Sequence, residues 1–226
     1  MKYKNIVKGK FLERPNRFIA YAEINGKTET VHVKNTGRCK EILIPGVTCY
    51  FEKSNNPNRK TLYDLVCVKK GDRLINIDSQ VVNKVFGEYL VSGKYFKNLD
   101  YIKPEKIYGK SRIDFYAERG KEKILIEVKG VTLENNNVVS FPDAPTERGT
   151  KHIYELIKAH KEGYETYIVF VVQMNNIKYF KPNDETDPKF GQALREGKKE
   201  GVKIIALDCN VFENEIFIEN KINILL

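Results

Sequence analysis

The chain has 226 residues, of which 41% are hydrophobic and 31% are charged, a composition typical of a globular protein with one large domain or two small ones. No apolar run approaches the roughly 18 residues of a membrane-spanning helix, and the basic N-terminus lacks the apolar core of a secretory signal, so we expect a cytoplasmic protein and no membrane partner. The four cysteines (Cys39, Cys49, Cys67 and Cys209) show no C-x-x-C spacing, which makes a zinc site unexpected.

The net charge of +9 is confined to the first part of the chain. Residues 1–85 contain 17 Lys and Arg against 8 Asp and Glu, whereas residues 86–226 contain 22 of each. A field of one sign on one module suits a polyanion such as nucleic acid. The alternative is a basic domain that binds nothing in particular.

Residues 1–80 read as short strands separated by turn signals, with Asn25-Gly26 as a strong hairpin signal. This pattern, with no long helix, predicts a small OB-like β-barrel over residues 1–80. The predicted strands are 17–24, 29–33, 47–52, 61–70 and 74–78.

Basic and aromatic side chains alternate along this barrel, as in folds that bind nucleic-acid strands on one face. The basic candidates are Arg14, Arg17, Arg38, Arg59 and Lys60. The turn Asn35-Thr36-Gly37-Arg38 offers backbone amides and a guanidinium to a phosphate, unless it is an ordinary turn. The aromatic residues Phe18, Tyr21, Tyr50 and Tyr63 either stack on bases or fill the barrel core.

Residues 81–226 follow an α-β-β-β-α-β-α-β order, which predicts an α/β domain with a mixed sheet. The predicted helices cover 81–93, 146–163 and 188–201, and the strands include 111–118, 123–130, 137–142, 166–173 and 202–208. The run Thr166–Gln173 is continuously apolar, as in a strand covered on both faces. Its last residue, Gln173, either faces the site or caps the sheet edge.

The stretch "SRIDFYAERGKEKILIEVKG" (111–130) carries the candidate chemistry. A hairpin that turns at Gly120-Lys121 places Glu118 opposite Lys123 and Asp114 opposite Glu127, with Lys129 on the same face. Two adjacent carboxylates repel unless a cation lies between them, and Mg²⁺ favours such sites. The pattern therefore predicts an Mg²⁺ or Mn²⁺ site at Asp114 and Glu127, with Lys129 acting on the attacking water or on transition-state charge. The alternative is a surface cluster of exposed ion pairs that includes Arg112.

Long motifs in this sequence resemble those of the sugar fermentation stimulation protein A family, whose second domain is similar to PD-(D/E)XK nucleases. The matching segments include "HVKNTGRCKEILIPG" (32–46), "EVKGVTLE" (127–134) and the idiosyncratic "FPDAPTERGTKH" (141–152). One departure is Ile113, where the nuclease motif carries proline. The resemblance implies an OB-like domain, a restriction-endonuclease-like domain over residues 81–226, nonspecific DNA binding and a link to sugar (maltose) metabolism.

The resemblance also extends the candidate site. It implies Glu88 as a third acid, unless Glu88 is an ordinary exposed helical residue, and the Val128 carbonyl as a metal ligand. It also implies phosphate contacts from Arg148, Lys151 and His152 on one helix face, unless that face is simply solvated. Arg112 is a further candidate for nucleic-acid binding.

Three functional interpretations remain open. The first two are a DNA-binding Mg²⁺-dependent nuclease and a DNA-binding regulator whose nuclease-like domain no longer cleaves. A third is a phosphodiesterase for small nucleotides, with the barrel serving assembly. We expect single- or double-stranded DNA with little sequence specificity as the partner. The sequence does not decide whether the chain forms a homodimer.

Overall fold

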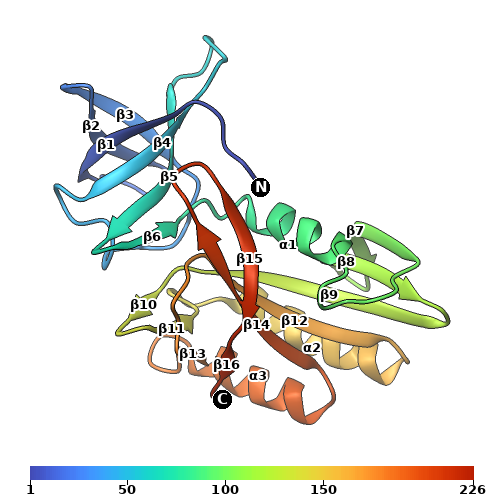
Figure 1. Ribbon diagram of the computed structural model, residues 1–226. Coiled ribbons are helices and arrows are strands. Elements are labelled where there is room, and N and C mark those ends of the chain that lie inside the picture. The colour runs from blue at the N-terminus through green and yellow to red at the C-terminus, as the bar shows by residue number, and fades with distance from the viewer.

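The computed structural model describes residues 1–226 and begins with a closed five-stranded barrel (Figure 1). Its strands are β1 (Ile6–Glu13), β2 (Ile19–Ile24), β3 (Lys27–Val33), β4 (Thr48–Lys53) and β5 (Tyr63–Lys70). Strand β3 pairs antiparallel with β2 and parallel with β5, which closes the sheet on itself.

The barrel differs from the predicted one in its first strand along the chain, β1, and in the last predicted strand, β6. Strand β1 is not among the predicted strands, because Lys8, Gly9 and Lys10 interrupt the apolar alternation. A Cβ atom at Gly9 would lie 2.5 Å from the Glu23 carbonyl oxygen, so glycine is needed where β2 crosses closely. Strand β6 (Arg73–Asn76), which we predicted as a barrel strand, instead extends a hairpin from β5.

A mixed six-stranded sheet forms the centre of the second part of the chain, in the order β15-β14-β12-β9-β8-β7. Its strands are β7 (Tyr101–Tyr108), β8 (Ser111–Arg119), β9 (Glu122–Val131), β12 (Glu165–Val172), β14 (Lys203–Val211) and β15 (Ile216–Lys221). Strand β12 is parallel to both β9 and β14, and the outer pairs are antiparallel. The predicted fold class, an OB-like barrel followed by an α/β domain with a mixed sheet, is confirmed.

Helices cover both faces of this sheet (Figure 1). Helix α1 (Val82–Val91) packs Val85 and Phe86 into one core cluster, while α2 (Glu147–Lys161) and α3 (Pro188–Lys199) pack into the other. Both later helices begin where side chains satisfy free backbone amides: Thr146 accepts from Gly149, and Asp187 accepts from Phe190. None of the helices is long and apolar enough to span a membrane.

Most of a second, four-stranded sheet was not predicted, nor were the two edge strands of the large sheet, β7 and β15. The small sheet contains β10 (Glu134–Asn135), β11 (Val138–Phe141), β13 (Tyr179–Pro182) and β16 (Asn223–Ile224). Of these, only β11 is a predicted strand. Edge strand β7 is largely exposed and contains Pro104, so it lacks the apolar alternation that marks a buried strand.

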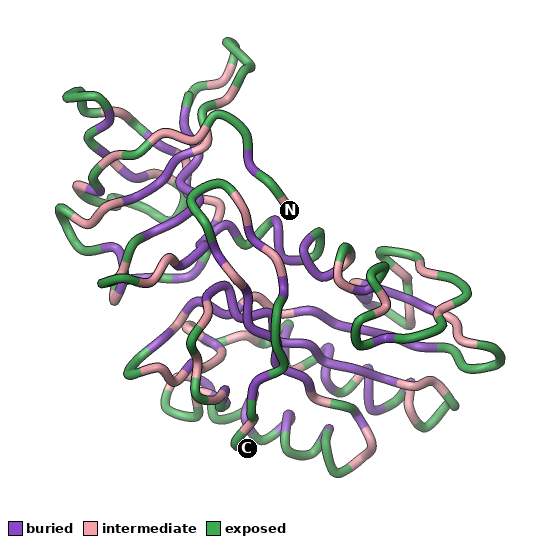
Figure 2. The backbone as a smooth tube through the Cα atoms, in the orientation of Figure 1, coloured by how far each residue is buried: buried purple, intermediate pink, exposed green.

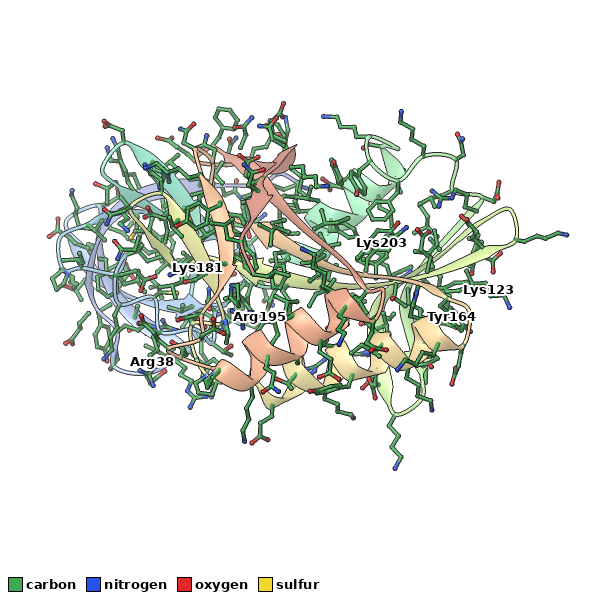
Figure 3. The ribbon with its side chains drawn as sticks, turned by 90° about the horizontal axis from the view of Figure 1, so that it is seen from below. Arg38, Lys123, Tyr164, Lys181, Arg195 and Lys203 are labelled. Atoms are coloured by element: carbon green, nitrogen blue, oxygen red, sulfur yellow. The ribbon has the colours of Figure 1, made fainter.

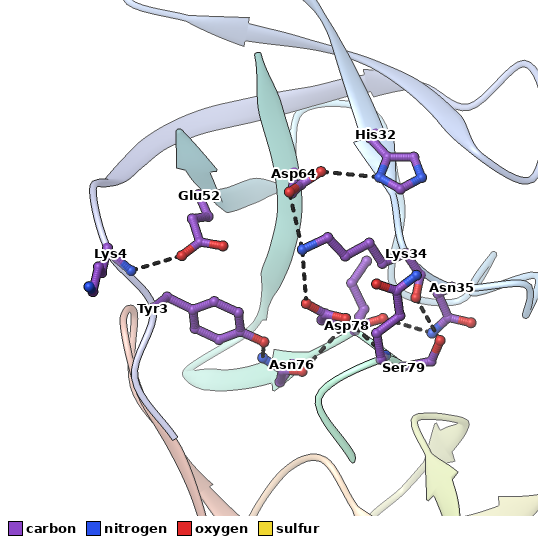
Figure 4. A network of polar contacts seen from close by, with 12 residues as sticks. Tyr3, Lys4, His32, Lys34, Asn35, Glu52, Asp64, Asn76, Asp78 and Ser79 are labelled. Carbon is purple, nitrogen blue, oxygen red and sulfur yellow. Dashed lines mark hydrogen bonds and ion pairs between the residues drawn. The ribbon is translucent and has the colours of Figure 1, made fainter. Parts of the chain in front are cut away.

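Buried polar contacts join the barrel to the second domain. The Gln173 side-chain amide donates to Asn76 Oδ1 at 2.8 Å and to the Asp78 carbonyl at 3.0 Å. Asn76 in turn donates to the Tyr3 hydroxyl (Figure 4). Gln173 is therefore buried at the domain junction and does not cap a free sheet edge. Figure 2 shows that the strands at this junction are buried, whereas the hairpin tips are exposed.

Candidate functional site

The hairpin β8–β9 has the predicted turn and register. Glu118 pairs with Lys123, and Gly120 adopts a positive φ of 57° at the tip. The regular ladder ends at Phe115–Ile126, one pair before Asp114 and Glu127.

Asp114 uses its side chain where the ladder stops. Its Oδ2 accepts the Val128 backbone N–H at 2.8 Å, and its Oδ1 accepts from the Asn83 side chain at 2.8 Å. Because the N–H and C=O of one strand residue point to the same edge, the Val128 carbonyl is directed toward the Asp114 side of β9. The predicted set of Asp114, Glu127 and the Val128 carbonyl is thus brought to one place.

Glu127 is almost completely buried, at 2% exposure, between β9 and α2. Its Oε1 accepts from Lys129 Nζ at 2.5 Å and from His152 Nδ1. Its Oε2 is buried and has no hydrogen-bond partner. One carboxylate oxygen is therefore held in place by two donors, while the other is buried without a partner.

The two carboxylates influence each other's ionisation. Burial and the nearby charge of Glu127 raise the pKa of Asp114 above its ordinary value. Burial alone would also raise the pKa of Glu127, but the hydrogen bond from His152 and the charge of Lys129 outweigh it and lower that pKa. At neutral pH Glu127 stays charged, and Asp114 is the member of the pair whose charge is disfavoured.

These residues fit a small divalent cation. An unpartnered buried carboxylate oxygen next to a second carboxylate is a site of excess negative charge, which a cation relieves. No group of three or more acidic, histidine or cysteine side chains is placed to hold a metal ion. A cation here would have two carboxylates and a carbonyl as its protein ligands, the kind of sparse oxygen site that Mg²⁺ completes with water.

A strongly basic hollow of about 480 Å³ lies at the start of α2. It has no hydrophobic lining, and its residues are Lys110, Ser111, Arg112, Glu147, Arg148, Lys151 and His152. The structure thus brings together the predicted residues Arg112, Arg148, Lys151 and His152, and it adds Lys110, which sequence reasoning missed.

His152 does not lie on a solvated helix face, which was the alternative to a phosphate contact. It is only 3% exposed, because α2 packs against the sheet and turns this side chain toward Glu127. Since a carboxylate only accepts hydrogen bonds, Nδ1 of His152 carries the proton. His152 therefore joins the basic hollow to the carboxylate pair.

A second basic hollow, of about 520 Å³, lies between the barrel and the loop before α2. It is lined by Arg14, Asn16, Arg17, Thr36, Gly37, Arg38, Lys40, Ala144 and Pro145. Asn35 lies behind this wall and donates to the Ile77 carbonyl at 2.9 Å, and its Oδ1 accepts from the Gly37 backbone. The predicted Asn35–Arg38 turn is therefore braced from inside and exposed on one side.

Arg14 organises this hollow from beneath. Its guanidinium donates to the carbonyls of Arg17, Asn35, Gly37 and Arg38 at 2.6–3.0 Å. These bonds occupy both terminal nitrogens, so Arg14 contributes charge and loop shape to the hollow in place of the direct phosphate contact that its sequence position indicated.

Arg59 and Lys60 lie apart from both hollows. Arg59 binds Asp64 through both terminal nitrogens, at 2.6 and 2.9 Å. Asp64 also pairs with Lys34 at 3.1 Å and with His32 at 3.1 Å (Figure 4). Arg59 is therefore committed to a buried carboxylate that sequence analysis did not single out, and Lys60 is exposed on the adjoining loop.

Glu88 is not brought to the carboxylate pair. It pairs with the Met1 amino group at 2.6 Å. The α1 residue that contacts Asp114 is Asn83, and five residues of helix separate the two by about 140° of rotation and roughly 7.5 Å of rise. Asn83 is a polar residue in the first turn of α1, but Lys84 beside it is polar too, so no local sequence signal singles out Asn83.

Comparisons with known proteins match both parts of this architecture. The family described as "SfsA N-terminal OB domain" matches residues 12–77, and the "Sugar fermentation stimulation protein RE domain" matches residues 80–215. The chain belongs to the sugar fermentation stimulation protein (SfsA) family. The recognised resemblance is therefore confirmed.

Members of this family are similar over the whole chain. A sugar fermentation stimulation protein homolog of Clostridium beijerinckii is 56% identical over 226 residues, covering 100% of both chains. A Desulfitobacterium hafniense homolog is 58% identical over 216 residues, covering 96% of this chain and 94% of its own. A solved structure of Pyrococcus furiosus SfsA in complex with Ca²⁺ is 31% identical, with a TM-score of 0.87, covering 100% of this chain and 98% of that one.

Proposed function

We propose that this protein binds DNA with little sequence specificity and cleaves its phosphodiester bonds at a site that requires Mg²⁺ or Mn²⁺. The observation that carries the proposal is Glu127, whose Oε1 is fixed by Lys129 and His152 while its buried Oε2 has no partner. Burying a carboxylate with an unpartnered oxygen lowers the stability of the fold, and such destabilising features occur mainly at functional sites.

Each residue has a distinct task in the proposed reaction. Asp114, Glu127 and the Val128 carbonyl would hold the cation, which activates water and neutralises charge on the transferring phosphate. Lys129, at 16% side-chain exposure and bound to Glu127, offers its remaining N–H groups to the attacking water or to the developing negative charge. His152 and Lys129 together keep Glu127 ionised and fixed in one orientation.

The two basic hollows support DNA as the substrate. One lies at the start of α2 beside His152, and the other lies on the barrel beside Arg38. Two separate groups of cations fit a polyanion that extends beyond one phosphate, and they favour DNA over a small nucleotide.

The comparison structure supports a divalent cation in this fold. Pyrococcus furiosus SfsA was solved in complex with Ca²⁺, a hard cation that takes oxygen ligands as Mg²⁺ does. For this chain we propose a cytoplasmic location. The family name adds stimulation of sugar fermentation, which we propose as a consequence of DNA binding.

The test measures cleavage and metal binding in the same variants. Purified protein is incubated with single- and double-stranded DNA and RNA in Mg²⁺, Mn²⁺ or EDTA, and Mn²⁺ binding is followed by calorimetry. Asp114→Asn and Glu127→Gln are expected to lower cleavage by about 100-fold or more and to weaken Mn²⁺ binding. Glu122→Gln, on the same strand but in an exposed ion pair, is the matched control and should change neither.

Two outcomes decide between the interpretations. Cleavage that survives in both Asp114→Asn and Glu127→Gln refutes the proposed site. DNA binding by the wild-type protein without cleavage of any substrate in either metal favours the non-catalytic regulator.

A further inference from the structure

We infer that the barrel binds a single nucleic-acid strand by stacking one unpaired base on Phe18. The inference rests on the proposed function, because it names the strand form that the DNA-binding surface prefers. It starts from the four aromatic residues of the barrel that the sequence singled out as candidates for stacking. Two of them, Tyr50 and Tyr63, are buried, at 5% and 7% exposure. Phe18 is 55% exposed, and no other aromatic ring packs against it.

The loop that carries Phe18 is held in one conformation. Asn16 Oδ1 accepts from the backbone N–H groups of Phe18 and Ile19, at 2.9 and 3.0 Å. The Phe18 carbonyl accepts from Val33 at 2.7 Å, and Arg14 donates to the Arg17 carbonyl at 2.7 Å. Because the backbone around Phe18 is already fixed, less conformational entropy is lost when a ligand covers the ring, which favours binding.

The surroundings of Phe18 select a polyanion as the ligand. Arg17, which directly precedes Phe18 in the chain, lines the barrel hollow together with Arg38 and Lys40, and none of these three side chains forms an ion pair with a carboxylate. Beneath them, the Arg14 guanidinium donates to carbonyls, and a carboxylate at this turn, that of Asp143, accepts from the Arg38 backbone N–H at 3.0 Å and not from these side chains. Unpaired cations beside an exposed aromatic ring are the two components of single-strand recognition: charge for the backbone and a flat face for a base.

Stacking on Phe18 requires an exposed base face, which favours a single strand over an intact duplex. Bases in a duplex are stacked on one another, so their faces are not available to a side chain. One wall of this barrel hollow is Ala144-Pro145. Glu147, two residues farther along the chain, lines the other basic hollow, at the start of α2. Figure 3 shows Arg38 at the end of the molecule where α2 and α3 begin, whereas Lys123 and Tyr164 lie at the opposite end. A strand bound at Phe18 therefore lies at the same end as the start of α2, where His152 contacts Glu127.

The first experiment compares affinities across salt concentrations. Phe18→Ala should weaken binding of single-stranded DNA by about 5- to 100-fold, weaken duplex binding much less, and leave the salt slope unchanged, because stacking involves no ion release. Arg38→Ala should instead reduce the magnitude of the slope by about 0.7 for a single strand. The matched control is Phe212→Ala, an equally exposed phenylalanine (53%) that precedes the acidic residues Glu213 and Glu215.

The second experiment uses the absence of tryptophan from this chain. Phe18→Trp introduces the single tryptophan of the chain at the stacking position. Its emission, excited selectively over that of the 13 tyrosines, should be quenched when single-stranded DNA is added, whereas the emission of Phe212→Trp should respond little. Phe18→Trp should also retain the wild-type affinity for the single strand.

The outcomes separate this inference from the proposed function. Equal losses of single-strand and duplex affinity in Phe18→Ala, or binding without quenching in Phe18→Trp, overturn the stacking site and leave DNA binding in place. Failure of the wild-type protein to bind any nucleic acid overturns both.

Discussion

Replacing Asp64 by asparagine is expected to destabilise the barrel, although Asp64 touches neither basic hollow. Its side chain is 5% exposed and is held by three cationic or potentially cationic groups: Arg59, Lys34 and His32 (Figure 4). Lys34 also contacts Asp78 at 3.5 Å, next to the domain junction. The substitution keeps the shape of the side chain and removes its charge.

The size of the effect follows from the pKa of this carboxyl group. Burial alone would raise it, but the hydrogen bonds and charges of Arg59 and Lys34 outweigh burial and lower the pKa to about 2 from an ordinary value of 3.8. A shift of this size corresponds to about 2 kcal/mol of unfolding free energy at neutral pH. For a chain of this length, that is a fall in Tm of about 4–8 °C.

The pH dependence has a definite sign. A carboxyl group whose pKa is lowered by folding stabilises the protein above its ordinary pKa, and this contribution is lost as the pH falls toward the folded value. The stability difference between wild type and Asp64→Asn should therefore be constant from about pH 5 to 8 and fall to about half at pH 3.

Urea unfolding at pH 7 and pH 3 measures both quantities. Asp72→Asn, an exposed barrel acid with no ion pair, is the control and should change stability by less than about 0.5 kcal/mol. The reasoning is refuted if Asp64→Asn destabilises the protein equally at both pH values, or no more than Asp72→Asn does at pH 7.

Two further predictions concern residues that sequence analysis assigned to DNA. Arg59→Ala should lower the free energy of unfolding by about 1–3 kcal/mol and leave the salt dependence of DNA binding unchanged, because its guanidinium is committed to Asp64; a reduced salt slope, measured by fluorescence anisotropy, would argue for a phosphate contact instead. Gly37→Ala would place a Cβ atom 2.1 Å from Asp143 Oδ2, so we expect weaker DNA binding and a lower Tm in thermal unfolding; wild-type affinity and Tm would mean that the turn can shift without cost.

Local patterns predicted the elements that carry their own signals. Asn25 and Gly26 both adopt positive φ in the β2–β3 turn, as Asn-Gly predicts for a two-residue hairpin. The Gly120 turn fixed the β8–β9 register correctly up to Phe115–Ile126. Strand β1 was missed because its apolar alternation is interrupted at the residue where the barrel requires glycine.

Partnership between distant residues was the part that local patterns could not decide. Arg14, Arg59 and His152 all looked available for phosphate, yet carbonyls, Asp64 and Glu127 respectively engage them in the fold. Apart from the Arg17 carbonyl, three residues from Arg14, their partners lie 5 to 25 residues away in the chain, beyond the spacing of a strand or helix face.

The sequence by itself determined the order of a basic barrel and an α/β domain, the hairpin turn, and the residue types Asp114, Glu127 and Lys129 at its strands, because turn chemistry and strand alternation are local properties. Only the tertiary structure decided that Glu127 is buried with one free oxygen, that Asn83 and not Glu88 meets Asp114, and that Phe18 alone among the four barrel aromatics considered is both exposed and flanked by unpaired cations. Burial and charge pairing depend on which elements pack against a residue, and that packing is a property of the whole chain.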